Sequence, residues 1–145
     1  MLTGLNLKAL VIAWAIDIIG STVIGFAALV VVIVSKQLGV DDLADQAALT
    51  RLIYGPEVLV PSFAVGCVFS LVAGYVAARI AGTRELVHGL ASSAASVAVT
   101  LGSIRQMVEF LPTAVIVGGI VLSIGFGFVG GWLRLATKRS ELAAR

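Results

Sequence analysis

The sequence predicts an all-α integral membrane protein that crosses the bilayer as four transmembrane helices within a single domain. Hydrophobic residues make up 59% of the 145 residues and charged residues only 12%, and the mean hydropathy is +1.09. A soluble domain of this size leaves a large fraction of its area in water and cannot bury so much apolar surface. Four long apolar runs, joined mostly by short polar segments, are the second observation.

Each apolar run approaches or exceeds the roughly 20 residues that a spanning helix needs. The first contains one charge, Asp17, and would extend about 39 Å as a helix, so we expect it to tilt or protrude. Pro56 and Glu57 suit a helix N-terminus just before the second run, and Pro112 opens the fourth. The third is the most polar because it carries His88 and several serines. Backbone groups in lipid must be satisfied within the segment, so each run is expected to be helical. The runs are residues 9–34, 58–78, 86–104 and 113–135.

Charge and cysteine content exclude several kinds of protein. The net charge of +2 is too small to indicate a nucleic-acid partner. The single cysteine, Cys67, excludes an intramolecular disulfide and a zinc site built from several cysteines. The first apolar run is longer than a signal-peptide core and lacks a small-residue cleavage site, so we expect it to be retained.

The distribution of basic residues predicts that both termini are cytoplasmic. With the N-terminus inside, seven of the ten lysines and arginines fall on the cytoplasmic side and three on the opposite side. Residues 36–57 then form an external loop. The cytoplasmic set is Lys8, Arg79, Arg84, Arg134, Lys138, Arg139 and Arg145, and the opposite set is Lys36, Arg51 and Arg105.

The loop at residues 36–57 has two interpretations. In one, Asp41 or Asp42 caps a short helix whose apolar residues Leu43 and Ala47 face the membrane surface. In the other, the loop is a solvated connector.

Small residues recur at every fourth position in the second and fourth apolar runs. Residues four apart lie near one face of a helix, and small side chains there let two backbones approach closely. Close packing of this kind holds helices together in lipid, so we predict that these stripes are helix-packing faces. They comprise Ser62, Gly66, Ser70, Gly74, Ala78 and Gly82 in the second run and Gly119, Ser123, Gly127 and Gly131 in the fourth.

The two stripes also resemble each other in sequence. Residues 69–75 read F-S-L-V-A-G-Y and residues 126–132 read F-G-F-V-G-G-W. An Arg-hydrophobic-Ala triplet follows each, beginning at Arg79 and at Arg134. This similarity suggests two tandem helical hairpins in parallel orientation.

One stretch carries a resemblance to known proteins. Ala73-Gly-Tyr-Val-Ala-Ala-Arg79-Ile-Ala-Gly82, followed by His88-Gly89, resembles a motif of small uncharacterised bacterial four-helix membrane proteins. The match covers roughly 17 residues. The family has no established activity, and the resemblance implies a bacterial inner-membrane setting.

Asp17 is the main candidate functional residue. It lies about 12 Å past the start of its span, where an unpaired carboxylate costs several kcal/mol. It must therefore face protein, and three interpretations remain open. It forms an ion pair with Arg79 or Arg134, it is protonated and hydrogen-bonded to serines, or it is an ion or proton site.

Hydroxyl groups and one imidazole form a polar face beside Asp17. One hypothesis is a hydrated or proton-conducting path along the first and third spans. The alternative is hydrogen bonding between helices together with one histidine at the membrane interface. The polar residues are Ser21 in the first span and His88, Ser92, Ser96 and Thr100 in the third.

Other chemistry is excluded by context. Residues 125–130 match the G-x-G-x-x-G dinucleotide pattern, but they lie in mid-membrane without the preceding strand that this site requires. His88 has no second histidine or nearby cysteine with which to hold a metal. No oxyanion arrangement accompanies the serines, so they do not indicate a hydrolase. We therefore expect no catalytic residues, cofactor or metal.

Of three function classes, an enzyme has the least support, because the chain has few reactive groups. The chain is a structural or accessory subunit of a membrane assembly or homo-oligomer, whose partners are the lipid bilayer and other membrane chains or copies of itself. Alternatively, it is a channel or small transporter that uses Asp17 and the polar face of the third span.

Overall fold

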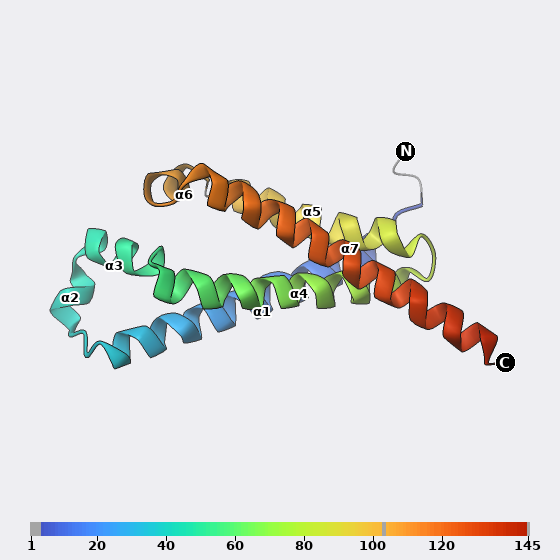
Figure 1. The fold of residues 1–145 in the computed structure, drawn as a ribbon, viewed down its shortest axis with the longest axis horizontal. Helices are drawn as coiled ribbons and strands as arrows, with labels where there is room; N and C mark the ends of the chain where they lie inside the picture. The colour runs from blue at the N-terminus through green and yellow to red at the C-terminus, as the bar shows by residue number, and fades with distance from the viewer. Residues whose placement is uncertain (1–3, 103, 145) are drawn as a thin grey trace.

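The structure of the chain, a computed structural model, describes residues 4–102 and 104–144, and all regular structure in them is helical (Figure 1). The predicted all-α class is confirmed for these residues. The helices are α1 (Leu7–Ser35), α2 (Val40–Ala44), α3 (Gln46–Ile53), α4 (Pro56–Ala81), α5 (Glu85–Gly102), α6 (Ile104–Phe110) and α7 (Thr113–Ala143).

Three of the described helices, α1, α4 and α7, are long and apolar enough to cross a membrane. They correspond to the first, second and fourth predicted spans. The shorter α5 covers most of residues 86–104, and its histidine and serines lower its hydropathy. The count of four spans therefore stays a prediction.

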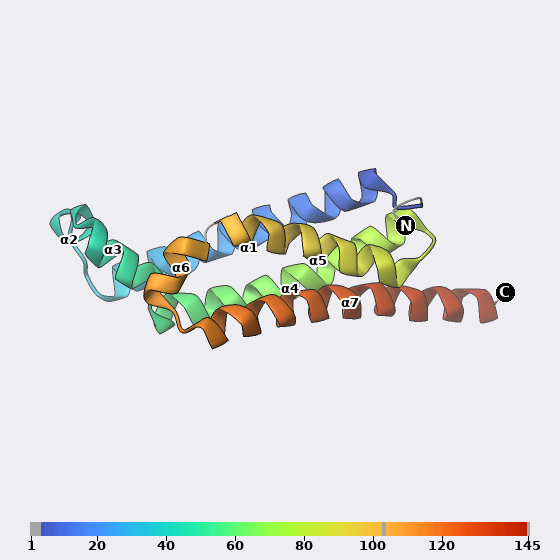
Figure 2. The ribbon, with the colours of Figure 1, turned by 90° about the horizontal axis from the view of Figure 1, so that it is seen from above.

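The helices α1, α4, α5 and α7 form an elongated bundle (Figure 1). α4 packs against α1, α5 and α7, and α5 also packs against α1 and α7. α1 and α5 run in one direction along the bundle, and α4 and α7 run in the other (Figure 2). The short helices α2, α3 and α6 lie at one end, while α7 extends beyond the bundle at the other.

Specific contacts define the ends of α1 and α4. The side chain of Asn6 accepts a hydrogen bond from the Ala9 amide (3.1 Å) and caps α1. Lys36, just past α1, forms an ion pair with Glu57 in the first turn of α4 (2.5 Å). At the other end of α4, Gly82 adopts φ +68°, the left-handed conformation that commonly terminates helices.

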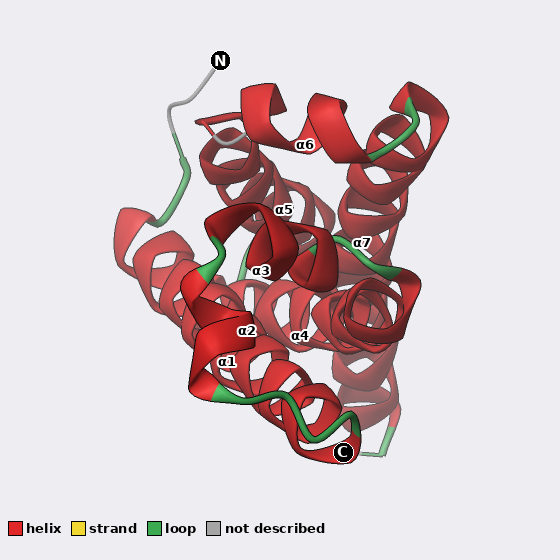
Figure 3. Ribbon diagram, turned by 90° about the vertical axis from the view of Figure 1, so that its left-hand side faces the viewer, coloured by secondary structure: helices red, strands yellow, loops and turns green. Residues whose placement is uncertain are grey.

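The loop between α1 and α4 forms the two short helices α2 and α3, which in the end-on view lie in front of the bundle (Figure 3). The predicted cap is only partly right: Asp45, not Asp41 or Asp42, caps the longer helix α3, by accepting from the Ala47 amide at 2.9 Å. Asp42 instead accepts from the Gly39 amide at the start of α2. The side chain of Asp41 lies outside the described part of the structure.

Glycines bring α4, α5 and α7 into backbone contact. A β-carbon added at Gly74 would lie 2.9 Å from the Cα of Gly127, and one added at Gly89 would lie 3.0 Å from the Cα of Gly131. Gly130 of α7 meets the backbone of α4 equally closely. Any larger side chain at these positions would push the helices apart, so α7 is held in a glycine-lined seam between α4 and α5.

The predicted packing role is wrong for Gly66. A β-carbon there would meet nothing within 4 Å. One turn earlier on α4, the ring of Phe63 lies against Gly119 of α7. A β-carbon added at Gly119 would lie 3.1 Å from this ring. This bulky contact replaces the glycine-to-glycine contact of the seam, and space opens beside Gly66.

Small residues make up most of the interior, whereas large apolar side chains point outward. Ala13, Ala73 and Ala77 form a buried cluster between α1 and α4. Val23 and Phe26 are among the many large apolar residues on the outer surface. This inverted distribution is the one expected when lipid, rather than water, surrounds the helices.

Candidate functional site

Asp17 is buried in the centre of the bundle, with 4% of its surface exposed. The Ser70 hydroxyl of α4 lies 3.2 Å from its Oδ1 and 3.3 Å from its Oδ2, and donates to the carboxylate. The Ser96 hydroxyl of α5 donates to Oδ2. Two helices that are far from α1 in sequence therefore place hydroxyl donors on its carboxylate.

A third helix joins this cluster through Ser123 of α7. Its Oγ lies 3.1 Å from the Oγ of Ser70, within hydrogen-bonding distance. Ser21 lies one turn after Asp17 and donates to the main-chain oxygen of Asp17 (2.5 Å), which leaves the carboxylate to the other helices. We call Asp17, Ser70, Ser96 and Ser123 the carboxylate cluster.

The expected ion pair of Asp17 with Arg79 or Arg134 is wrong for this structure. Arg79 is exposed at the end of α4. Arg134 binds Glu141 on its own helix, with Nη1 and Oε1 at 3.0 Å. No ion pair to Asp17 is found in the described part of the chain, so uncharged hydroxyls are its direct side-chain partners there.

A partly open cavity of about 670 Å³ leads away from the carboxylate cluster toward the end of the bundle that carries α6. Asp17 is the sole charged residue in its lining as far as the structure describes it. Beyond the cluster the wall is mostly apolar and includes Leu59, Phe63, Met107, Leu111, Val115 and Ile116. The volume falls within the range of about 300–1,000 Å³ that is usual for small-molecule sites.

Three further wall residues matter for the chemistry of the cavity. The Ser62 Oγ is buried and has no hydrogen-bond partner among the described residues, which is unusual for a buried hydroxyl. Cys67 is 7% exposed and contributes a thiol to the wall. Gly66, which lies between Ser62 and Ser70 on the same face of α4, leaves the wall without a side chain.

The polar face predicted on the third span is divided in the structure. Ser96 reaches Asp17, whereas the Ser92 hydroxyl donates to the Gly89 carbonyl of its own helix (2.8 Å). The side chain of Thr100 lies outside the described part. The described residues therefore do not form a continuous polar path along α5.

His88 is fully buried within the bundle, close to the start of α5. Its Nε2 accepts from the Asn6 amide (2.9 Å), and its Nδ1 faces the Arg84 carbonyl (3.1 Å). A carbonyl only accepts, so Nδ1 carries the proton and the ring is neutral in this arrangement. His88 thus fastens the start of α1 to the start of α5.

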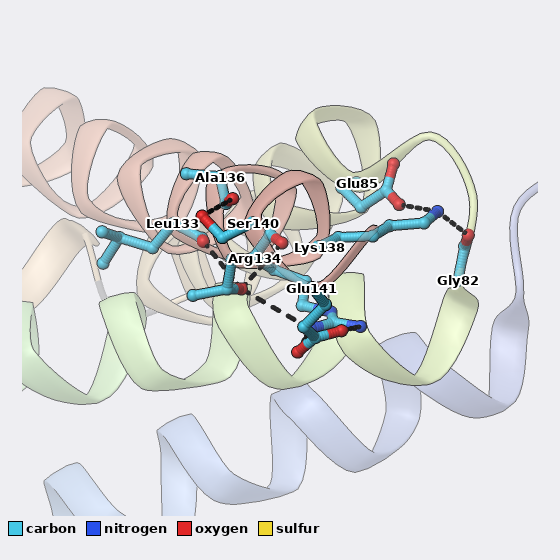
Figure 4. Close-up of polar contacts among 9 residues, drawn as sticks. Gly82, Glu85, Leu133, Arg134, Ala136, Lys138, Ser140 and Glu141 are labelled. Carbon is cyan, nitrogen blue, oxygen red and sulfur yellow. Dashed lines mark hydrogen bonds and ion pairs between the residues drawn. The ribbon is translucent and has the colours of Figure 1, made fainter. Parts of the chain in front are cut away.

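A group of polar contacts joins α7 to the turn between α4 and α5 (Figure 4). The sequence did not indicate it. The Lys138 Nζ donates to the Gly82 carbonyl (2.7 Å) and to Glu85 Oε1 (2.6 Å). The hydrogen bond from Lys138 lowers the pKa of Glu85 below its usual value. The spacing of 53 residues between Glu85 and Lys138 gives no local signal for this pair.

The packing role of Ser93 was also not predicted from the sequence. Ser93 is buried at 1% exposure against Gly127, and its hydroxyl has no hydrogen-bond partner among the described residues. Its small size is what admits the close approach of α5 and α7.

No group of three or more histidine, cysteine, aspartate or glutamate side chains within the described ranges is arranged to hold a metal ion. Comparison of the chain with protein-family models finds no match, and comparisons with curated proteins and with solved structures also find none.

Proposed function

We propose that this chain is a small multi-pass transporter of the bacterial inner membrane, in which Asp17 takes up and releases a proton at the closed end of the cavity. In this proposal α5 is the fourth span, and both termini are cytoplasmic. The end that carries α2, α3 and α6 then faces the outside, and the cavity extends from Asp17 toward that end.

The observation that carries the proposal is the carboxylate at the end of a cavity. A carboxylate buried within the membrane is costly and calls for a reason. Ser70 and Ser96 donate to Asp17, but neutral hydroxyls reduce the cost only in part. The open path to the carboxylate gives protons and solutes access to it.

The length and surroundings of α5 support a fourth span. Its 18 residues extend about 27 Å, close to the thickness of the hydrocarbon core of about 30 Å. Its polar groups are turned into the bundle, since His88, Ser92 and Ser93 are all buried. A helix can therefore cross lipid despite a low hydropathy when its neighbours cover its polar side.

The proposal is tested by proton movement in proteoliposomes. Protein is reconstituted with a pH-sensitive dye inside the vesicles, and a potassium-diffusion potential, negative inside, is imposed. Wild-type protein is expected to acidify the lumen, and Asp17→Asn is expected to abolish the flux while remaining folded. Asp42→Asn, a matched change in the exposed loop, should behave as wild type. Equal fluxes for wild type and Asp17→Asn, or a wild-type flux no greater than in empty vesicles, would overturn the proposal.

The second candidate is a structural or accessory subunit, or a homo-oligomer. It is favoured by a glycine of α7 that contacts nothing within the described chain. Gly125 is exposed and would accommodate a β-carbon with nothing within 4 Å. A second helix can approach closely at such positions. Native mass spectrometry of the extracted protein distinguishes a single copy from a complex, and Gly125→Leu should dissociate a complex that uses this face.

A further inference from the structure

We propose that the cavity binds an organic monovalent cation with an apolar body, whose charge pairs with Asp17 and whose body lies along α4 over Gly66. This inference rests on the proposed function, because it names the class of solute that the same site takes.

The one charged residue in the described wall favours a ligand with a single positive charge. Asp17 is the sole charged residue that lines the cavity, and its partners from the packed helices are the hydroxyls of Ser70 and Ser96. Cys67 is the other titratable group in this wall. A bound cation would compensate the buried carboxylate more completely than hydroxyl donors do, because opposite charges attract strongly where the dielectric constant is low.

The wall beyond Asp17 selects an apolar body. A small, strongly hydrated metal ion would need several oxygen ligands, and the remaining wall is dominated by aliphatic and aromatic side chains. The ring of Phe63 adds a surface on which an organic cation is attracted by the aromatic quadrupole. A delocalised or alkylated cation loses little hydration on entering such a site.

The missing side chain at Gly66 provides the space. Ser70 and Ser62 are eight residues apart on α4, which places them about 12 Å apart along the helix. Midway between them, a β-carbon at Gly66 would meet nothing within 4 Å. The buried Ser62 hydroxyl, which has no partner in the described chain, ends this length of wall. A ligand lying here covers Ser62 and Gly66 while its charge reaches Asp17.

Binding is an exchange of ions. Protonated Asp17 and the free cation give a bound cation, ionised Asp17 and one proton released to water. No bond other than the O–H bond of the carboxyl group is broken, and charge is conserved. While Asp17 is protonated in the empty protein, the Kd is therefore expected to fall about tenfold for each unit rise in pH.

The probe for the test is tetraphenylphosphonium, and its control is tetraphenylborate, which has nearly the same shape and the opposite charge. Binding to the full chain in nanodiscs is measured by equilibrium dialysis between pH 6 and pH 9, with the lipid background subtracted. The expected result is saturable binding of the phosphonium with release of one proton, loss of binding in Asp17→Asn, and no saturable binding of the borate.

Gly66→Leu tests the position of the ligand without altering the carboxylate. The leucine side chain enters open space, so the protein should fold and melt like the wild type yet bind the phosphonium at least tenfold more weakly. Cys67, the single cysteine of the chain, reports occupancy: the bound phosphonium should slow its alkylation in wild type and not in Gly66→Leu.

The outcomes separate this inference from the proposed function. Proton flux that depends on Asp17, without saturable phosphonium binding, would overturn the cation inference and leave the transporter proposal standing. Phosphonium binding that is unchanged in Gly66→Leu and in Asp17→Asn would also overturn the inference, since the probe would then bind elsewhere. If the wild type shows neither proton flux nor saturable phosphonium binding, the transporter proposal and the cation inference are both overturned.

Discussion

Gly74 of α4 and Gly127 of α7 lie in direct backbone contact, so that a β-carbon on Gly74 would sit 2.9 Å from the Cα of Gly127. The obstructing atoms belong to the main chain and cannot rotate away. The seam between α4 and α7 is therefore intolerant of the smallest possible side-chain addition, which makes it directly testable.

Gly74→Ala is expected to lower the free energy of unfolding by about 1–3 kcal/mol, the usual cost of overpacking. The matched control is Gly125→Ala on the outer face of α7, where a β-carbon meets nothing within 4 Å. That change should be neutral or should stabilise by up to about 1 kcal/mol, because alanine favours helix over glycine. Equilibrium unfolding in mixed micelles measures both, and equal effects of the two variants would contradict the seam.

Asp17 is expected to be energetically coupled to Ser96 and not to Arg134. In a double-mutant cycle, Asp17→Asn combined with Ser96→Ala should show an interaction energy of about 0.5–3 kcal/mol, because the two side chains are in contact. Asp17→Asn combined with Arg134→Gln should be additive within about 0.5 kcal/mol. The reverse pattern would restore the ion pair that the sequence suggested.

The topology is expected to place the α2–α3 loop and the C-terminal part of α7 on opposite sides of the membrane. Ala47→Cys and Ser140→Cys, each in a Cys67→Ser background, introduce single thiols at exposed positions. An impermeant maleimide added to intact cells should label residue 47, and residue 140 should react only after permeabilisation. Labelling of both residues from one side would exclude the arrangement with four spans.

The contribution of Glu85 to stability is expected to disappear in acid. Its pKa is lowered in the folded state by the hydrogen bond from Lys138, so the folded protein favours the ionised carboxylate. This stabilisation is present above the usual glutamate pKa of 4.5 and is lost as the pH falls through the lower folded value.

Wild type should therefore be more stable than Glu85→Gln at pH 7, and the difference should shrink below pH 4. Thermal unfolding at both pH values measures the difference. Glu141→Gln is the control, because the partner of Arg134 is 60% exposed and a pair so exposed contributes little. A difference for Glu85→Gln that does not vary with pH would refute the role of its charge.

Hydropathy predicted the three longest helices because long uninterrupted apolar runs have few alternatives. It placed the end of the fourth run at residue 135, whereas α7 continues to Ala143. Lys138 and Arg139 are polar but good helix formers, and hydropathy detects only the part that meets lipid. It did not reveal α6, whose seven residues include Arg105 and Glu109 and form a helix of their own next to the third run.

The members of the carboxylate cluster were all named from sequence, but their association was not predicted. Ser70 and Ser123 were assigned to packing stripes and Ser96 to a polar face, because each pattern is local to one helix. Their meeting at Asp17 depends on the register between helices, which no local spacing determines. The choice of an arginine partner failed because Arg134 has a nearer acceptor, Glu141, on its own helix.

α7 supplies contacts that both α4 and α5 need, and it is translated after both of them. Until it leaves the ribosome, Gly74 and Gly89 have no opposing backbone, and Ser70 lacks its neighbour Ser123. The earlier helices can insert into the membrane and contact one another, but α4 and α5 lack the helix that packs against both of them. A stalled or truncated nascent chain would thus expose an open glycine groove to membrane proteases. Only a chain that has completed α7 can form these contacts, so the presence of α7 distinguishes complete molecules from fragments.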